Sequence, residues 1–200
     1  MKLRFSAASP FVRKVMVVAH EHGLADGIER LPADPWDPKT DLLNQNPLSK
    51  VPALIIDDGT VFFDSPVICE YLDATGGGPK LFPAPGPARW RALRQQALGD
   101  GILDAGITTR RERMRPEGER SPGAIERQMN VLKRGLATLE GWADEIEGPL
   151  TIGQVTVGCC LGWIDFRDMA PGWRERQPKL ARWFEGFARR PSMAATVPVG

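Results

Sequence analysis

The chain has 200 residues, of which 42% are hydrophobic and 26% charged, an ordinary composition for a globular protein with a sizeable core. Twenty-six basic and 25 acidic side chains leave a formal net charge of +1, so charge gives no general reason to expect a nucleic acid or an anionic membrane as partner. No stretch approaches the roughly 20 apolar residues that cross a bilayer, and the first residues lack the apolar core of a signal peptide.

The cysteines and histidines indicate neither a disulfide framework nor a metal site. Three cysteines, two of them adjacent (Cys69, Cys159 and Cys160), pair poorly, so a reducing cytoplasm is the expected location. The two histidines, His20 and His22, stand two residues apart, which is no metal-ligand spacing. No metal is therefore expected.

The first 76 residues predict a small α/β domain. Residues 2–6 alternate between charged and apolar side chains, as in a short strand. Ser9 and Pro10 suit a helix cap and a first helical position, and an apolar stripe continues to Gly23. A weaker strand is expected at residues 28–31, before a stretch rich in Pro, Asp and Asn.

A hairpin and a second helix complete this domain. Two apolar runs, residues 51–56 and 60–63, flank an Asp-Asp-Gly turn. Ser65 and Pro66 repeat the cap-plus-proline start, and the helix ends at three glycines from Gly76. The order strand, helix, strand, loop, hairpin, helix predicts one small sheet with helices packed against it.

The rest of the chain predicts a linker and an all-helical domain. Residues 77–86 are rich in Pro and Gly and suit a linker, and residues 87–200 contain no convincing strand. Long helices are expected from Pro87 and over residues 121–148. A third begins at Thr151 with a capping box, and a fourth carries an apolar stripe from Leu180 to Phe187; these make a helical bundle.

Ser9 is the first candidate for chemistry. A hydroxyl at a helix N-terminus lies among free backbone N–H groups and the positive end of the helix dipole. A thiolate bound there is stabilised, and the thiolate rather than the thiol is the nucleophile. Taken alone, Ser9 is more simply a helix cap.

Two further segments have the same ambiguity. A cis Val51–Pro52 bond would leave the backbone N–H and C=O of Val51 free to pair with a peptide-like ligand, but most X-Pro bonds are trans. Asp64 and Ser65 offer a carboxylate and a hydroxyl at a helix start, a pair that suits an amino-acid head group or a simple cap. Lys50 adds a cation beside these segments, or only a solvated loop charge.

In this order and spacing the sequence resembles the glutathione transferase superfamily, over nearly the whole chain, and bacterial cytosolic members with a catalytic serine are closest in character. Ser9-Pro10-Phe11 looks like the family's active-site junction, residues 46–54 look like its cis-proline segment, and Asp64-Ser65 looks like its acidic-Ser pair. Leu150 to Gln154 resembles the family's capping box, where aspartate is more usual than Gln154.

The resemblance implies a thioredoxin-like domain that binds glutathione, followed by a helical bundle. Ser9 would donate a hydrogen bond to the glutathione sulfur, with Phe11 lining the cleft. Val51, beside cis Pro52, would pair with the cysteinyl unit through its backbone. The other expected glutathione contacts are Lys50 to the glycine carboxylate and Asp64 and Ser65 to the γ-glutamyl group.

The resemblance also implies a homodimer and a site for an electrophile between the domains. The side chains proposed for that site are Thr108, Thr109, Arg111, Met114, Trp163 and Phe166. A run of arginines over residues 110–115 favours an anionic substrate, contact with nucleic acid or a solvated helix end, and the interspersed acidic residues favour the last.

The expected reaction is attack of the glutathione thiolate on a small electrophilic, partly apolar molecule. Because position 9 carries no cysteine, a mixed-disulfide mechanism is disfavoured. Two alternatives stay open on the same scaffold: a glutathione-dependent isomerase, dehalogenase or β-etherase, and a non-catalytic regulatory or binding protein. The joint presence of Ser9, Lys50, Val51-Pro52 and Asp64-Ser65 favours an enzyme.

Overall fold

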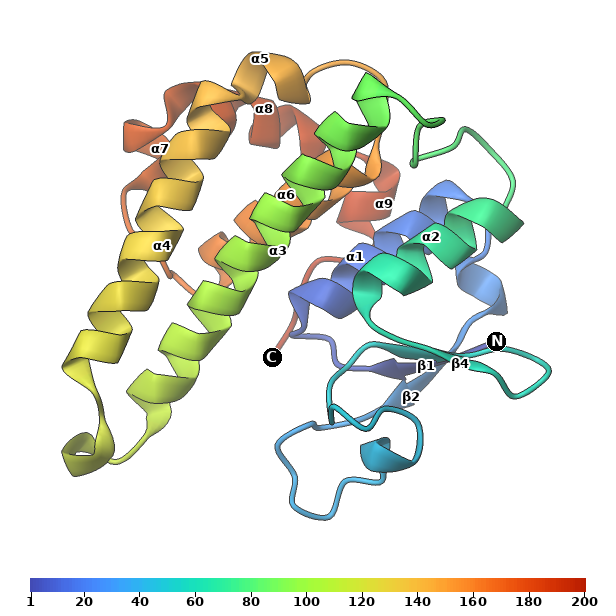
Figure 1. Ribbon diagram of the computed structural model, residues 1–200, viewed down its shortest axis with the longest axis horizontal. Helices are drawn as coiled ribbons and strands as arrows, with labels where there is room; N and C mark the ends of the chain where they lie inside the picture. The colour runs from blue at the N-terminus through green and yellow to red at the C-terminus, as the bar shows by residue number, and fades with distance from the viewer. The chain divides into compact units, whose positions relative to one another are not determined.

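The computed structural model describes residues 1–200, which form two compact units, one of Met1–Arg89 with Pro191–Gly200 and one of Trp90–Arg190 (Figure 1). The first unit contains β1 (Lys2–Phe5), α1 (Pro10–Glu21), η1 (Ala25–Gly27), β2 (Glu29–Pro32), η2 (Leu42–Asn44), β3 (Ala53–Ile55), β4 (Val61–Phe62), α2 (Ser65–Thr75) and α9 (Pro191–Ala194). The predicted order of strands and helices is confirmed.

The sheet has the strand order β2-β1-β3-β4. β1 runs parallel to β2 through the α1 crossover, and β3 is antiparallel to both β1 and β4. Leu3 and Leu54 are register partners and are both fully buried, and Phe62 meets Tyr71 of α2 with ring centroids 4.6 Å apart. These side chains face α1 and α2, which pack together on one side of the sheet, while η2 lies on the other (Figure 1). This is a thioredoxin-like arrangement.

The second unit is all-helical, as predicted. Its elements are most of α3 (Pro87–Met114), then η3 (Glu117–Glu119), α4 (Pro122–Gly141), α5 (Ala143–Ile146), α6 (Ile152–Phe166), α7 (Trp173–Arg176) and α8 (Pro178–Phe187). α6 is buried along almost its whole length, as expected from its apolar sequence. None of the helices combines the length and the apolar character that a membrane crossing requires.

Two glycines let α3 and α6 lie in close contact. A Cβ added at Gly99 would lie 2.9 Å from Thr156 Cγ2, and one added at Gly106 would lie 2.6 Å from Trp163 Cζ3. Because real Cβ atoms do not approach other atoms so closely, only glycine fits at these two points. We call this contact line the α3–α6 seam.

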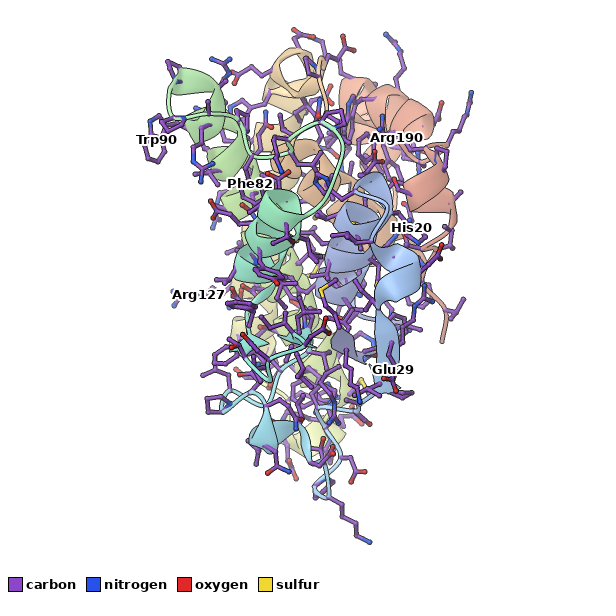
Figure 2. The ribbon with its side chains drawn as sticks, turned by 90° about the vertical axis from the view of Figure 1, so that its right-hand side faces the viewer. His20, Glu29, Phe82, Trp90, Arg127 and Arg190 are labelled. Carbon is purple, nitrogen blue, oxygen red and sulfur yellow. The ribbon has the colours of Figure 1, made fainter.

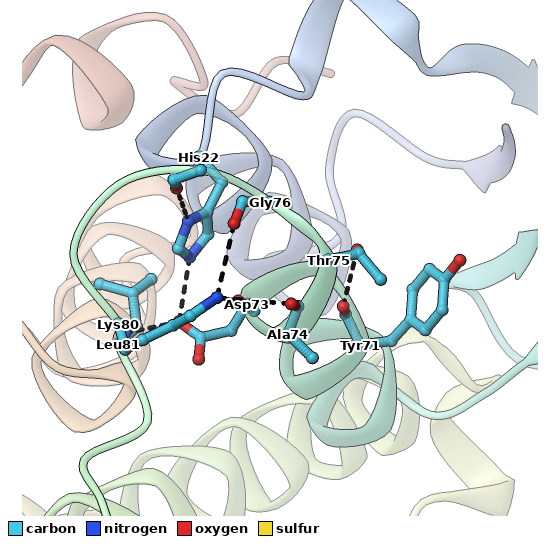
Figure 3. Close-up of polar contacts among 9 residues, drawn as sticks. His22, Tyr71, Asp73, Ala74, Thr75, Gly76, Lys80 and Leu81 are labelled. Carbon is cyan, nitrogen blue, oxygen red and sulfur yellow. Dashed lines mark hydrogen bonds and ion pairs between the residues drawn. The ribbon is translucent and has the colours of Figure 1, made fainter.

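The C-terminal end of α2 is held to α1 by a buried cluster of polar groups (Figure 3). His22 Nε2 lies 3.0 Å from Asp73 Oδ1, both side chains are almost wholly buried, and His22 Nδ1 contacts Gly77 O. Asp73 Oδ1 also accepts from the Leu81 N–H at 2.5 Å, and Lys80 Nζ donates to the Asp73 carbonyl. The predicted linker is thus fastened at its start by side-chain contacts.

The structure differs from the sequence expectations at two places. The helix expected over residues 121–148 ends at Gly141, and α5 follows after Trp142, because glycine costs little to leave a helix. Residues 191–200, expected with the helical domain, pack instead in the first unit. There Met193 is fully buried and its carbonyl accepts from Arg13 Nη2 at 3.1 Å, which gives this segment an anchor on α1.

The expected capping box at the start of α6 is present, with glutamine in the usual place of aspartate. The Thr151 N–H donates to Gln154 Oε1 at 2.7 Å, and Gln154 Nε2 donates to the Ile146 carbonyl. The Gln154 side chain therefore caps the start of α6 and also binds the turn that precedes it.

The α3–α6 seam leads to a prediction about stability. Gly106→Ala should lower the free energy of unfolding by about 1–3 kcal/mol, because the new methyl group meets a rigid, buried indole ring. Gly101→Ala on the same helix is the matched control, since nothing lies within 4 Å of its added Cβ; it should raise stability by about 0.5–1 kcal/mol. Urea unfolding measures both, and equal stability of the two variants would contradict the seam.

Candidate functional site

The strand register brings three turns of the first unit to one edge of the sheet. Arg4, near the end of β1, pairs with Ala53 at the start of β3. Leu54 pairs in turn with Phe62 at the end of β4. The segments that leave β1, enter β3 and leave β4 therefore meet at this edge, and they carry the residues that the sequence singled out: Ser9, Val51, Pro52, Asp64 and Ser65.

Ser9 is the N-cap of α1, with its Oγ accepting from the Val12 N–H at 3.3 Å. A hydroxyl that accepts in this way keeps its own proton for donation to another atom. The first turn of α1 contains no acidic side chain that would offset the positive end of the helix dipole beside Ser9. The side chain is half-buried, as is Phe11 two residues further on.

The Val51–Pro52 peptide bond is cis, as the resemblance implies. Pro52, just before β3, is buried, whereas Val51 is only half-buried. The Phe63–Asp64 bond, at the neighbouring turn, is also cis.

Asp64 and Ser65 lie at the start of α2. Asp64 occupies the N-cap position and is exposed, but its carboxylate does not cap the helix. Ser65 is buried, with 2% of its surface exposed. A charged group in solvent next to a buried hydroxyl and free helix N–H groups is a set that can bind an ammonium and a carboxylate together.

Asn46 organises the loop that carries Lys50, a role that sequence reasoning did not assign. Its side chain is buried, donates to the Lys50 carbonyl at 2.8 Å and accepts from the Leu48 N–H at 3.0 Å. Ser49 completes the turn with a positive φ of 50°. The Asn46-Pro47 pair is a turn signal, and it could have indicated the role of Asn46 in this loop. Lys50 itself is exposed.

A second anchor, also missed, holds the preceding segment to β1. Arg4 Nη1 donates to Asp41 Oδ2 at 3.2 Å and to Gln45 Oε1 at 2.9 Å, and Arg4 Nη2 donates to Asp41 Oδ1. Arg4 is almost wholly buried by these contacts, although the alternation of β1 marks it only as a residue of the polar face. No local sequence signal links positions 4 and 41.

The six residues proposed for the electrophile site have very different surroundings. Thr109 is fully buried and its hydroxyl donates to the Ala105 carbonyl at 2.9 Å, and Trp163 packs on Gly106. Of the others, Thr108 and Met114 are exposed and Arg111 and Phe166 are half-buried. Their contact with a substrate stays a prediction.

The protein's own thiols are remote from solvent. None of the three cysteines forms a disulfide, and all three are buried. Burial, with smaller contributions from Asp100 and Cys159, raises the pKa of the Cys160 thiol well above its ordinary value. No group of three or more His, Cys, Asp or Glu side chains is placed to hold a metal ion.

Comparison with known proteins gives matches along the whole chain. Residues 8–75 match the family model described as glutathione S-transferase, N-terminal domain, and residues 122–186 match the one for the C-terminal domain. The uncharacterized GST-like protein YibF of Escherichia coli (strain K12) is 34% identical, over 99% of this chain and 98% of its own length.

Two solved structures are also similar. A glutathione transferase family member from Pseudomonas fluorescens Pf-5, with bound glutathione, is 39% identical with a TM-score of 0.95, covering 100% of this chain and 99% of that one. A second structure, with bound S-(propanoic acid)-glutathione, is 39% identical with a TM-score of 0.90 and covers 100% of both chains.

The Arg4–Asp41 anchor predicts a pH-dependent loop. The hydrogen bond from Arg4 is the main reason that the pKa of Asp41 lies below its ordinary value. A carboxylate of this kind stabilises the fold above its unfolded pKa, and the contribution is lost as the pH falls through the folded pKa. Protection of residues 41–46 from amide exchange, corrected for intrinsic rates, should therefore fall in acid.

Asp41→Asn should show reduced protection of this segment already at neutral pH, with no further acid loss attributable to the anchor. Asp58→Asn is the matched control, because the pKa of Asp58 is also lowered, mainly by the Thr60 N–H, at a different turn. Identical protection of residues 41–46 in wild type and Asp41→Asn would show that the anchor does not hold the loop.

Proposed function

Since the chain belongs to the glutathione S-transferase family, we propose that it is a glutathione transferase, which joins the glutathione thiolate to a small, partly apolar electrophile. The observation that carries the proposal is the position of Ser9 at the N-terminus of α1, where its hydroxyl proton can be donated to a ligand. The cis Val51–Pro52 bond and the Asp64–Ser65 turn lie at the same edge of the sheet. A non-catalytic role on the same fold would not need this combination.

The proposed glutathione contacts follow the three turns. Ser9 donates to the sulfur, and Phe11 lies beside it on the first turn of α1. Val51, before cis Pro52, pairs through its backbone with the cysteinyl unit. Lys50, on the loop that Asn46 holds, approaches the glycine carboxylate. Asp64 and Ser65 bind the γ-glutamyl ammonium and carboxylate at the start of α2. The bound glutathione of the 39% identical Pseudomonas relative supports this assignment.

The chemistry requires only a stabilised thiolate and a positioned electrophile. The Ser9 hydrogen bond and the α1 dipole favour loss of the thiol proton to solvent. Lowering a thiol pKa by two units, about 2.7 kcal/mol, is enough to ionise most of the bound glutathione near neutral pH. The thiolate electron pair then forms the S–C bond, and the electrophile releases a leaving group or takes a proton from water after addition to a double bond.

The electrophile is proposed to contact the helical unit through exposed or half-buried side chains. Four of the six candidates meet that condition: Thr108, Arg111, Met114 and Phe166. Thr109 and Trp163 are buried and would support the contact surface from within the helical unit. The relative that holds S-(propanoic acid)-glutathione supports a small substituent on the sulfur. We also propose residues 1–76 and 87–200 as the two functional domains, and a cytoplasmic location.

Ser9→Ala tests the proposed function. Glutathione titrated onto the wild-type protein should give thiolate absorbance in the ultraviolet at a pH well below the ordinary thiol pKa. The variant loses the donated hydrogen bond, so its bound thiol should ionise at a pKa about one to two units higher, equivalent to about 1.4–2.7 kcal/mol. Ser121→Ala, which removes the same kind of cap from α4, is the matched control and should leave the titration unchanged.

Two results would contradict the transferase. If glutathione does not bind saturably to the wild-type protein, the proposed glutathione site is wrong. Binding with an unshifted thiol in the wild-type protein would leave a glutathione-binding or scaffold protein without activation of the sulfur.

A homodimer is the second part of the proposal, supported by exposed apolar groups. Trp90, which projects from α3 in Figure 2, is 67% exposed, and Leu48 on the first unit is 60% exposed. A surface pocket of about 260 Å³ between α3 and α4 is lined mostly by small and apolar side chains, among them Ala97 and Val131. Contiguous apolar surface commonly marks interfaces, and most soluble oligomers are symmetric homo-oligomers.

Trp90→Asp should therefore weaken self-association, because it would bury a charge in the interface. Sedimentation velocity of the wild type should show a dimer that the variant shifts toward monomer. Lys39→Asp, which places the same charge at an exposed and already charged position, is the control and should stay dimeric. A monomeric wild type would contradict the dimer and leave the Ser9 prediction untouched.

A further inference from the structure

The fold of the first unit leaves the backbone N–H of Val51 without a partner. Pairing between β1 and β3 begins at Ala53, so Val51 lies just outside the ladder. Its N–H makes no hydrogen bond to any other group of the chain. A backbone N–H that the fold leaves unpaired is bound by water or by a ligand. This group is therefore a donor that a ligand can use.

The carbonyl of the same peptide group is held by Asn46. Asn46 Nδ2 donates to the Lys50 carbonyl at 2.8 Å. The Lys50–Val51 bond is trans, so its carbonyl and its N–H point in opposite directions from one plane. A donor that fixes the Lys50 carbonyl therefore also fixes the Val51 N–H and directs it away from the Asn46 side chain.

All four polar groups of Asn46 make hydrogen bonds. Besides the bond from Nδ2, its N–H donates to the Leu42 carbonyl at 2.8 Å, its carbonyl accepts from the Ser49 N–H at 2.9 Å, and its Oδ1 accepts from the Leu48 N–H at 3.0 Å. Asn46 is 1% exposed, and Leu42 is fully buried. A buried residue held at four points cannot turn easily, so the direction that it imposes on the Val51 N–H is well defined.

The bond to the Lys50 carbonyl does more than close the loop. The contacts with Leu48 and Ser49 already form the turn, whereas the fourth bond reaches beyond it to the peptide that enters the strand. A donor on the carbonyl oxygen also makes the N–H of the same peptide a stronger donor, because hydrogen bonds in a chain polarise one another. Asn46 thus acts on both the direction and the strength of the Val51 donor.

We propose that Asn46 is a positioning residue for glutathione, which acts on the cysteinyl unit through the Lys50–Val51 peptide. Held in this direction, the Val51 N–H donates to the cysteinyl carbonyl and keeps the sulfur within reach of the Ser9 hydroxyl. Asn46 is buried, so it acts without touching the ligand. This inference rests on the proposed transferase function and adds a residue to its binding machinery.

Asn46→Asp isolates the bond to the Lys50 carbonyl. The carboxylate keeps the shape of the amide and still accepts from the Leu48 N–H, but it has no proton to donate to the Lys50 carbonyl. Calorimetric titration of the full chain should show glutathione bound about tenfold more weakly than by the wild type, because two acceptors replace one buried hydrogen bond. Asp41→Asn loosens the same loop at its Arg4 anchor and is the matched control; its effect on the affinity should be much smaller.

Hydrogen exchange of the Val51 amide, followed by NMR, tests the mechanism directly. In the wild type, saturating glutathione should slow this exchange at least about tenfold, because a hydrogen-bonded amide must be released before it exchanges. In Asn46→Asp saturated with glutathione, the slowing should be lost. A role in loop stability alone would lower the affinity but would leave the slowing intact once the variant is saturated.

Asn46→Ser covers the case in which Asn46→Asp does not fold. Its hydroxyl carries no charge and can accept from the Leu48 N–H, as serine does in similar turns, but it is too short to reach the Lys50 carbonyl as well. It should weaken glutathione binding about as much as Asn46→Asp.

Three outcomes would overturn the proposal: wild-type affinity in the Asn46 variants, equal weakening by Asp41→Asn, or slowing of Val51 exchange that survives in the saturated variants. Each of these leaves the glutathione site of the wild type standing and removes only the role of Asn46. If the wild type does not bind glutathione, the proposed function itself fails, and this inference fails with it.

Discussion

The antiparallel pairing of β1 with β3 is the constraint on which the candidate site depends. Leu3 and Leu54 face each other across it and are fully buried beneath α1 and α2, so a shift of one residue would expose both. The same register aligns the exit of β1 with the entry of β3 and, through β4, with the start of α2. A hydroxyl, a free backbone edge and a carboxylate from distant parts of the chain are thereby brought to one edge of a small sheet.

The site is built from helix starts and loops, and polar side chains hold those loops. Arg4 fastens the segment around Asp41 to the polar face of β1, and Asn46 closes the turn that leads to Lys50. His22 and Asp73 hold the end of α2 in a similar way. Loops with few apolar contacts depend on such bonds for their shape, because no hydrophobic core fixes them.

The parts of the fold that could be predicted are those whose cause is local. Serine followed by proline marked the starts of α1 and α4, where the serine caps the helix, and the Asp-Asp-Gly turn marked the hairpin, because caps and turns are decided by neighbouring residues. At α2 the expected cap at Ser65 was wrong by one residue, since Asp64 occupies the N-cap position and Ser65 is the first residue of the helix. The end of α4 at Gly141 and the return of residues 191–200 to the first unit could not be predicted this way. Both depend on which distant surface is available for packing.

The sequence by itself determined the order of the elements, the all-helical second half and, through the family resemblance, the residues proposed to bind glutathione. The tertiary structure decided which side chains meet: Arg4 with Asp41, Asn46 with its own loop, and Gly106 with Trp163. It also decided that Thr109 is buried. The reason is that local propensities act over a few residues, whereas the rotation of a helix and the partner of a charge depend on the packing of the whole domain.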